Sequence, residues 1–151
     1  MKKILCFMSV LILIFCTACS GSAVLEETSV PADNIDELSA RIGIEMSLPD
    51  GAGNVQYSII NDLIAQVQFT YNGIVFTHRS SKAYSGPALY GIEKQYTIIE
   101  TITVGEDVEA VLTSFKDGAT LVEWYENGNH HSLYSAKVIG TDVLTEIIEK
   151  L

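Results

Sequence analysis

The sequence predicts an α+β domain, with an antiparallel meander sheet of about six or seven strands between an N-terminal and a C-terminal helix. Segments of alternating apolar and polar residues recur between positions 55 and 135, which is the period of a strand. Turn-forming pairs such as Asn72-Gly73 and Asn127-Gly128 separate several of these segments. The clearest helical spacing of apolar residues lies at the two ends of this region. Strands in one block with flanking helices indicate an α+β class.

Residues 34–43, "NIDELSARIG", predict the first helix. Asn34 caps it, and Glu37 stands three positions later, where a capping box places its second member. Gly43 ends the helix. One side of the helix is apolar and is formed by Ile35, Leu38 and Ile42.

The next segments predict short strands at 44–48 and 55–60 and then a hairpin. From Leu63 to Tyr71 the apolar residues alternate with polar ones, and Asn72-Gly73 fits a two-residue type I′ turn. Such a turn fixes the register of the hairpin. It sets three pairs on one face, namely Tyr71 with Ile74, Phe69 with Phe76 and Val67 with His78.

Residues 80–91 have no clear period and predict an excursion loop. Strands are expected at 95–104, 108–115, 119–126 and 129–135, joined by turns at 105–107, 117–118 and 127–128. Two-residue turns in this second meander pair Trp124 with His131, Val122 with Leu133 and Thr113 with Val122. The last helix follows Gly140, has Thr141 or Asp142 as its cap, and places Val143, Leu144, Ile147, Ile148 and Leu151 at helical spacing.

The N-terminus has the layout of a secretory signal peptide over residues 1–18. Lys2 and Lys3 precede an apolar run, Ile4 to Ala18, of 15 residues. A membrane span needs about 20 residues, so we expect export and not a permanent transmembrane helix.

Cys19 follows this run after Thr17 and Ala18, which resembles the lipobox of bacterial lipoproteins. In that motif a small residue precedes a cysteine that is lipidated and becomes the new N-terminus. Cys16 fits the motif less well because Phe15 precedes it, and Cys16 itself stands where the motif prefers an aliphatic residue. Secretion without a lipid, by cleavage after Ala18 or Ala23, is the alternative.

Lipidation at Cys19 predicts an extracytoplasmic domain held on the cell membrane. Two acyl chains are enough for stable anchoring. The three cysteines all lie at or before the cleavage point, so the folded part is expected to have no disulfide. Residues 19–33, which are small, polar or acidic, predict a lipidated tether, and residues 34–151 predict one domain.

The charge excludes partners that are themselves acidic. After removal of residues 1–18, seven basic residues face 19 acidic ones, giving a net charge of about −12. Such a domain repels nucleic acid and anionic lipid. We therefore expect no nucleic-acid partner.

No residue pattern predicts a catalytic or metal site. His130 and His131 are adjacent on a strand and point to opposite faces, and His78 is distant in sequence. We expect His131 to pack on Trp124 across the hairpin. No serine lies in a nucleophile elbow, and no glycine motif fits a phosphate. The chain is expected to be no enzyme and to need no cofactor or metal.

Aromatic residues near the 80–91 loop are the candidate ligand-binding residues. Tyr84 and Tyr90 lie in this loop, and Tyr96 follows it. Tyrosine combines an apolar ring with a hydrogen-bonding group, which suits recognition. With the hairpin pair, the candidates are Tyr84, Tyr90, Trp124 and His131. Tyrosines that only cover the open face of the sheet are the alternative reading.

The segment "LVEWYENGNHHSLYS…GTDVLTEIIEKL" resembles the closing hairpin and helix of a small bacterial domain family of unknown function. That family occurs in Firmicutes outside the cytoplasmic membrane, in lipoproteins and at the C-termini of anti-sigma-factor-like membrane proteins. The resemblance covers about residues 33–151 and rests on Trp124, Tyr134, Thr141, Leu144, Ile147 and Leu151. It implies an envelope domain without an established activity.

Together these features predict a membrane-anchored lipoprotein of the cell envelope with a non-enzymatic binding or sensing domain. Its partner would be an envelope protein or peptide. The alternative is a carrier of an apolar ligand or lipid that uses the exposed face of the sheet.

Overall fold

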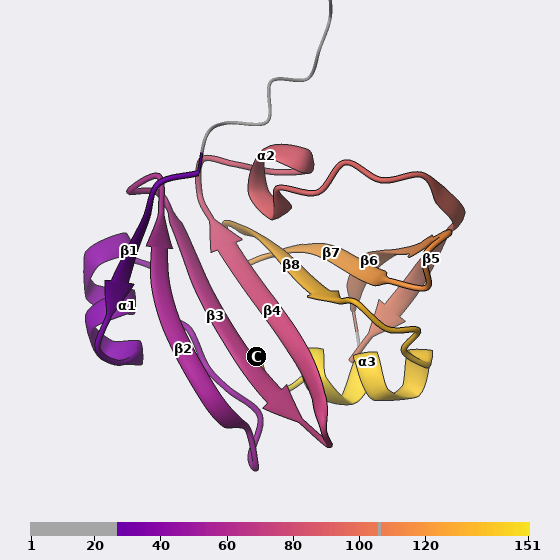
Figure 1. The fold of residues 1–151 in the computed structure, drawn as a ribbon, viewed down its shortest axis with the longest axis horizontal. Helices are drawn as coiled ribbons and strands as arrows, with labels where there is room; N and C mark the ends of the chain where they lie inside the picture. Colours follow the sequence, from indigo (N-terminus) through magenta and orange to yellow (C-terminus); the bar gives the residue numbers. More distant parts are fainter. Residues whose placement is uncertain (1–26, 106) are drawn as a thin grey trace, which may run out of the picture.

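The computed structural model describes residues 27–105 and 107–151. The predicted signal peptide, Cys19 and the first part of the tether lie outside the described residues. The described chain forms one antiparallel sheet of eight strands in the order β1-β2-β3-β4-β8-β7-β6-β5, with three helices (Figure 1). The α+β class is confirmed, but the predicted number of six or seven strands was too low.

The elements follow the chain in a simple order. The strands are β1 Ser29–Ala32, β2 Gly53–Ile60, β3 Ile64–Tyr71, β4 Ile74–Ser81, β5 Tyr96–Val104, β6 Val108–Phe115, β7 Thr120–Glu126 and β8 Asn129–Ser135. The helices are α1 Ile35–Ile42, α2 Pro87–Tyr90 and α3 Thr141–Ile148.

Two meanders make up the sheet, β1–β4 and β5–β8, and they join along a seam between β4 and β8. Five residue pairs form the seam, from Thr77 with Tyr134 to Ser81 with His130. Residues 82–95 carry the chain from the first meander to the far edge of the second, and α2 lies within them. β1 and β5 are therefore the two edge strands.

The hairpin at Asn72-Gly73 has the predicted register. Both turn residues have positive φ, 50° and 74°, as a type I′ turn requires. The pairs Tyr71–Ile74, Phe69–Phe76 and Val67–His78 are all confirmed. The pairs Trp124–His131 and Val122–Leu133 of the last hairpin are confirmed as well.

The hairpin around Asp117-Gly118 differs from its prediction by one residue. Val122 pairs with Leu112 and Thr113 pairs with Leu121, so the predicted pair Thr113–Val122 is wrong. Phe115 N–H donates to the Ala119 carbonyl, which leaves a loop of three residues, and Gly118 has φ +84°. A three-residue loop with its last residue in the left-handed region is the other common hairpin connection. The shift puts buried Val122 on the same face as Leu112.

Two further predictions about strands were wrong. Residues 44–48 form no strand. Ile44 and Met46 are buried in the core, so the alternation of apolar and polar residues there reflects side-chain packing and not pairing with a neighbouring strand. Ser29–Ala32, predicted as tether, forms the edge strand β1 and pairs with β2. Pro31 suggested a linker. An edge strand tolerates proline, however, because a residue that faces solvent on the outer side of the sheet needs no backbone N–H for the ladder.

The helix caps are partly as predicted. Asn34 caps α1 by accepting from Glu37 N–H at 2.9 Å, and Gly43 ends it with φ 71°. The Glu37 carboxylate accepts from the N–H of Asp33, one residue before the position that a capping box would use. The predicted cap of α3 was wrong, since Gly140 occupies the cap position and Thr141 is the first helical residue.

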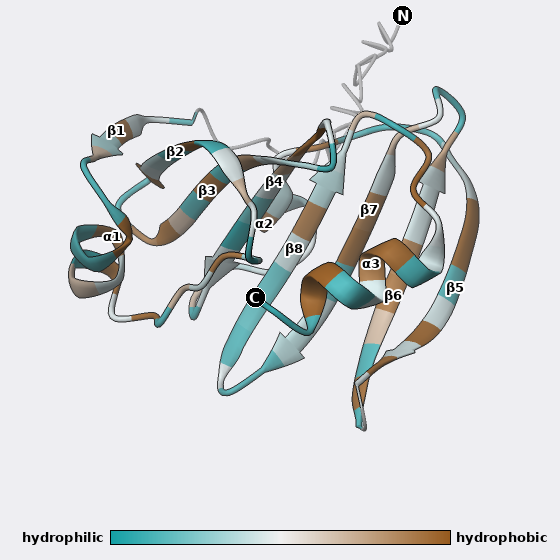
Figure 2. Ribbon diagram, turned by 90° about the horizontal axis from the view of Figure 1, so that it is seen from below, coloured by the Kyte–Doolittle hydropathy of each residue, from teal (hydrophilic) through white to brown (hydrophobic). Residues whose placement is uncertain are grey.

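The main core lies between one face of the sheet and the helices α1 and α3, and we call this the closed face (Figure 2). Its largest fully buried side chains include Phe69, Phe76, Leu38, Leu133, Leu144 and Ile147. The opposite face, which we call the open face, is covered only in part by α2 and residues 82–95. Within the described part of the chain, no helix is long and apolar enough to cross a bilayer.

Candidate functional site

The open face carries a groove of about 730 Å³ beside the edge strand β5. Its floor comes from β5, β6 and β7, and its wall comes from the segment that follows α2. The lining is mostly apolar or aromatic and includes Tyr90, Ile92, Tyr96, Ile99, Val111, Phe115 and Leu121. A second hollow of about 320 Å³ adjoins it at Val111 and Glu123 and extends to Tyr125 and His130. The two hollows share the lining residues Val111 and Glu123, and together they form the recess of the second meander.

The wall of the groove is fixed to the sheet by specific contacts. Leu89 is buried against Ile60 and Ile64, with Tyr84 packed on the same cluster. Arg79 donates to the Leu89 carbonyl at 3.2 Å. Lys94 donates to the Asp117 carboxylate at 2.6 Å and to the Tyr134 hydroxyl at 3.1 Å.

Glu123 supplies a half-buried carboxylate to the groove. It lines both hollows and forms no ion pair with any described residue. Burial raises its pKa. Burial, with a smaller contribution from Glu123, also raises the pKa of Tyr90 to about 12. The Tyr90 phenol is therefore neutral at physiological pH and is available as a hydrogen-bond donor.

Apolar side chains remain exposed along β5 and β6. Ile99 is 54% exposed and Tyr96 is 60% exposed, and Val111 on β6 is also exposed. The hydrophobic colour recurs along β5 at the margin of the sheet (Figure 2). Exposed apolar residues that cluster beside a recess mark surfaces where a ligand or a partner binds.

The structure divides the four predicted ligand-binding residues between the two faces. Tyr84, which precedes α2, and Tyr90, the last residue of α2, lie on the open face, and Tyr90 lines the groove. The side chains of Trp124 and His131 lie on the closed face, where Trp124 belongs to the main core, although both residues also border the second hollow. The four therefore form no single site, and only Tyr90 contributes its side chain to the main groove.

His131 and Trp124 belong instead to a stack that crosses the seam. Their rings are 5.0 Å apart and nearly parallel, as the predicted packing pair requires. His78 of β4 stacks on both, at 5.6 Å from Trp124 and 5.5 Å from His131, and its Nε2 lies 3.3 Å from His131 Nδ1. Sequence reasoning placed His78 far from this pair, because no local signal indicates that β4 joins β8.

Both histidines of the stack are held neutral. His78 is 1% exposed, and burial followed by the charge of His131 lowers its pKa to about 3. Burial lowers the pKa of His131 to about 4. His130 lies on the other face against Tyr125, at a ring distance of 4.8 Å. In the described residues no three metal-ligating side chains come together.

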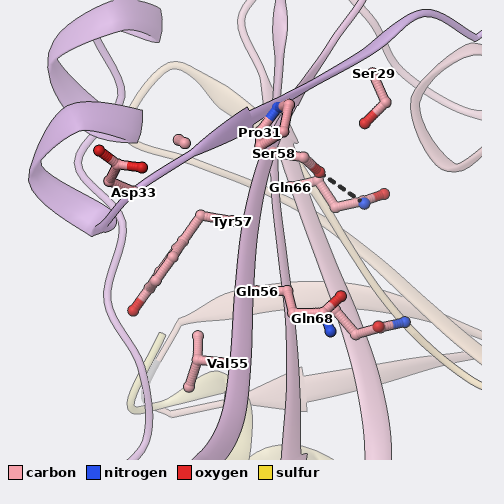
Figure 3. A pocket seen from close by; sticks show the side chains of 10 residues that line it. Ser29, Pro31, Asp33, Val55, Gln56, Tyr57, Ser58, Gln66 and Gln68 are labelled. Atoms are coloured by element: carbon pink, nitrogen blue, oxygen red, sulfur yellow. Dashed lines mark hydrogen bonds between the residues drawn. The ribbon is translucent and has the colours of Figure 1, made fainter.

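A polar hollow of about 480 Å³ lies at the other edge, beside β1 and β2 (Figure 3). Gln66 donates to Ser58 at 3.0 Å there, with Gln68 beside it. Tyr57 lies on the opposite side of the β2 ribbon from Gln66 and Gln68 in Figure 3. Side chains that diverge in this way cannot surround one ligand, so the groove beside β5 is the stronger candidate.

Comparisons with protein-family models, curated proteins and solved structures returned no match for this chain.

Proposed function

We propose that this chain is a lipoprotein of the bacterial cell envelope, anchored through Cys19 on the extracytoplasmic side of the membrane, with a non-enzymatic domain that binds or senses an envelope protein or peptide. The sequence around Cys19 supports the anchor. The small bacterial domain family that the C-terminal hairpin and helix resemble supports the location.

The observation that carries the binding role is the recess on the open face. Its apolar floor includes exposed Ile99 and Val111, while Glu123 and Tyr90 supply polar groups inside it. Apolar surface with a few convergent polar groups is the usual composition of a binding site. The groove adjoins the exposed edge strand β5, where an extended chain segment can lie beside it.

A carrier of an apolar ligand or lipid is the second candidate. It is favoured by the composition of the groove, where Ile92, Phe115 and Leu121 meet the aromatic rings of Tyr90 and Tyr96. The two candidates share the site and differ in the chemistry of the occupant.

The anchor is tested by mass spectrometry of the N-terminal peptide after expression in a bacterial host. The proposal predicts an acylated Cys19 and loss of membrane association in Cys19→Ala. Cys16→Ala is the matched control and should keep the lipid. An unmodified mature N-terminus contradicts the anchor.

The binding role is tested with Val111→Glu, which places a charge in the groove, and with Val75→Glu, its control on the open face of the first meander. Envelope fractions are passed over each variant and over the parent chain, and a fluorescent fatty acid is titrated into each. A partner or a fatty acid that is lost with Val111→Glu and kept with Val75→Glu supports the site. Equal behaviour of the two variants in both assays contradicts it.

A further inference from the structure

The edge strand β5 has a free outer side along nine residues. It pairs with β6 from Tyr96 to Val104 and is the last strand of the sheet. No other described strand lies beyond it, and all but two of its residues are exposed. An edge of this kind presents a row of backbone N–H and C=O groups that can pair with another chain.

Proteins normally protect such an edge with lysine, proline, bulges or short strands. The pairing of β5 with β6 shifts register between Tyr96 and Ile98, but it is regular from Ile98 to Val104. The strand contains no proline, no lysine and no glycine, and its one charged residue is Glu100. Its side chains include Ile98 and Ile99, both more than half exposed. The opposite edge, β1, is four residues long and contains Pro31. The less protected edge is therefore the one beside the groove.

The β5–β6 hairpin, which lies between Lys94 and Lys116, carries charge of one sign. The β5–β6 hairpin, residues 96–115, carries four acidic residues and no lysine, arginine or histidine. Those in the described chain, Glu100, Asp107 and Glu109, form no ion pair within it. Like-signed charge on a strand and its neighbour favours a partner of the opposite charge.

We infer that the outer edge of β5 takes an extended basic peptide segment as an additional strand of the sheet. Main-chain hydrogen bonds to β5 hold the peptide, and its alternating side chains meet the two sides of the strand. Residues on one side pair with Glu100, and apolar residues on the other side cover Ile99. This inference rests on the proposed binding role and names the chemistry of the partner.

A second copy of this chain is a poorer occupant for the same edge. Pairing β5 with its own copy brings two acidic hairpins together, and like charges on adjacent strands are destabilising. A basic strand converts the same carboxylates into cross-strand ion pairs.

The test uses the full chain in mild detergent and a fluorescent nine-residue peptide of alternating Lys and Val, which matches the nine residues of β5. A Glu-Val peptide tests the charge requirement. A Lys-Val peptide with N-methyl groups on alternate amides keeps the charge and removes backbone donors. We expect the Lys-Val peptide to bind at least about tenfold more tightly than either control, and to weaken as salt is raised.

Two lysine variants locate the site. Ile99→Lys places a charge on the edge strand, as natural edges do. Val75→Lys makes the same change in charge at an open-face residue of similar exposure, 52% against 54%. We expect Ile99→Lys to weaken Lys-Val binding by at least about tenfold and Val75→Lys by less than about twofold. Glu100→Lys should reverse the preference toward the Glu-Val peptide.

Three results overturn the inference. They are equal binding of the N-methylated peptide, equal loss in both lysine variants, and a dimer of the chain alone that dissociates with Ile99→Lys. If the Lys-Val peptide does not bind, but a partner or fatty acid is still lost with Val111→Glu and kept with Val75→Glu, strand addition is refuted and the binding role stands. Failure of both assays refutes the binding role itself.

Discussion

The two edge strands of the sheet, β1 and β5, differ in their length, their sequence and the contacts that hold them. At the first edge, β1 is short, contains Pro31 and is tied at its start by Thr28, which exchanges backbone and side-chain hydrogen bonds with Asn61. At the second edge, β5 is long, apolar and open to solvent on its outer side. Both belong to one sheet with one core, so the demands of folding do not explain the difference. An exposed apolar edge carries a risk of aggregation, and its presence points to a role in binding.

The same contrast extends to the segments that cover each half. Arg79, on β4, binds the Glu27 carboxylate through two nitrogens, at 2.6 and 3.0 Å, and also binds Gln66 and the Leu89 carbonyl. These contacts connect the N-terminal end of the described chain and α2 to the first meander. Nothing equivalent among the described residues covers the outer side of β5. In the proposed binding role the first meander would serve as the scaffold, and the second would present the binding surface.

The largest expected effect tests whether the two halves share one core. Phe69→Ala removes a fully buried ring from β3 and should lower the free energy of unfolding by about 3–5 kcal/mol. Ile99→Ala, on exposed β5, should change it by less than about 0.5 kcal/mol. Denaturant unfolding followed by circular dichroism measures both. Two separate transitions in Phe69→Ala would contradict a core shared by both halves.

Acid should weaken the seam between the halves. The pKa values of His78 and His131 are lower in the folded chain than their ordinary value of 6.5, so the unfolded chain takes up protons first as the pH falls. The stability is complete above about pH 6.5 and falls as the pH drops toward the folded pKa values near 4 and 3. Between pH 7 and pH 4 we expect a loss of about 3 kcal/mol from fully buried His78 and a further, smaller loss from partly exposed His131.

Unfolding at a series of pH values measures this loss. His78→Phe keeps a stacked ring and removes one titrating group, so its profile should be flatter. His130→Phe removes a histidine from the other face and should keep the steep profile. Identical slopes in the parent chain and His78→Phe would show that the stack does not carry the acid sensitivity.

Loss of the Arg79 contacts near the β1 edge should have an intermediate effect on the free energy of unfolding. Arg79→Met removes charged hydrogen bonds from a largely buried side chain and should cost about 1–3 kcal/mol. Hydrogen exchange should become faster at the amides of β1 and α2 and stay unchanged in β5. Faster exchange throughout the sheet would mean that Arg79 stabilises the whole fold and not one edge.

The smallest effect is expected at the open edge. Ile99→Lys adds a charge where the side chain is already exposed. The free energy of unfolding should therefore change by less than about 0.5 kcal/mol, and the melting temperature should shift only by the small amount that corresponds to this change. Differential scanning fluorimetry is sufficient to measure it. A large loss of stability would show that Ile99 serves the fold and would remove the argument from exposure.

Local sequence signals predicted the parts of the fold that local chemistry determines. Asn72-Gly73 specified its turn and therefore the register of β3 with β4, and Asn34 and Gly43 marked the ends of α1. Asp117-Gly118 was ambiguous, because the same pair also fits a three-residue loop, and the choice depends on burying Val122. Residues 29–32 carry too short a pattern to distinguish an edge strand from a tether.

Long-range features could not be predicted in the same way. The pairing of β4 with β8 joins residues that are 49 to 57 positions apart, so the contact of His78 with His131 had no local signal. Tyr90 was identified from its residue type, and it does line the groove. Glu123 and the open edge of β5 were missed, because strand order decides which strand lies at an edge and which carboxylate lies in a recess.

Hydrogen–deuterium exchange of the backbone amides, with and without the Lys-Val peptide, tests the central claim most directly. The account predicts that amides of β5 between Tyr96 and Val104 become protected on binding, while those of β1 keep their rates. Protection confined to the groove wall at residues 87–95, or no protection in β5, would contradict it.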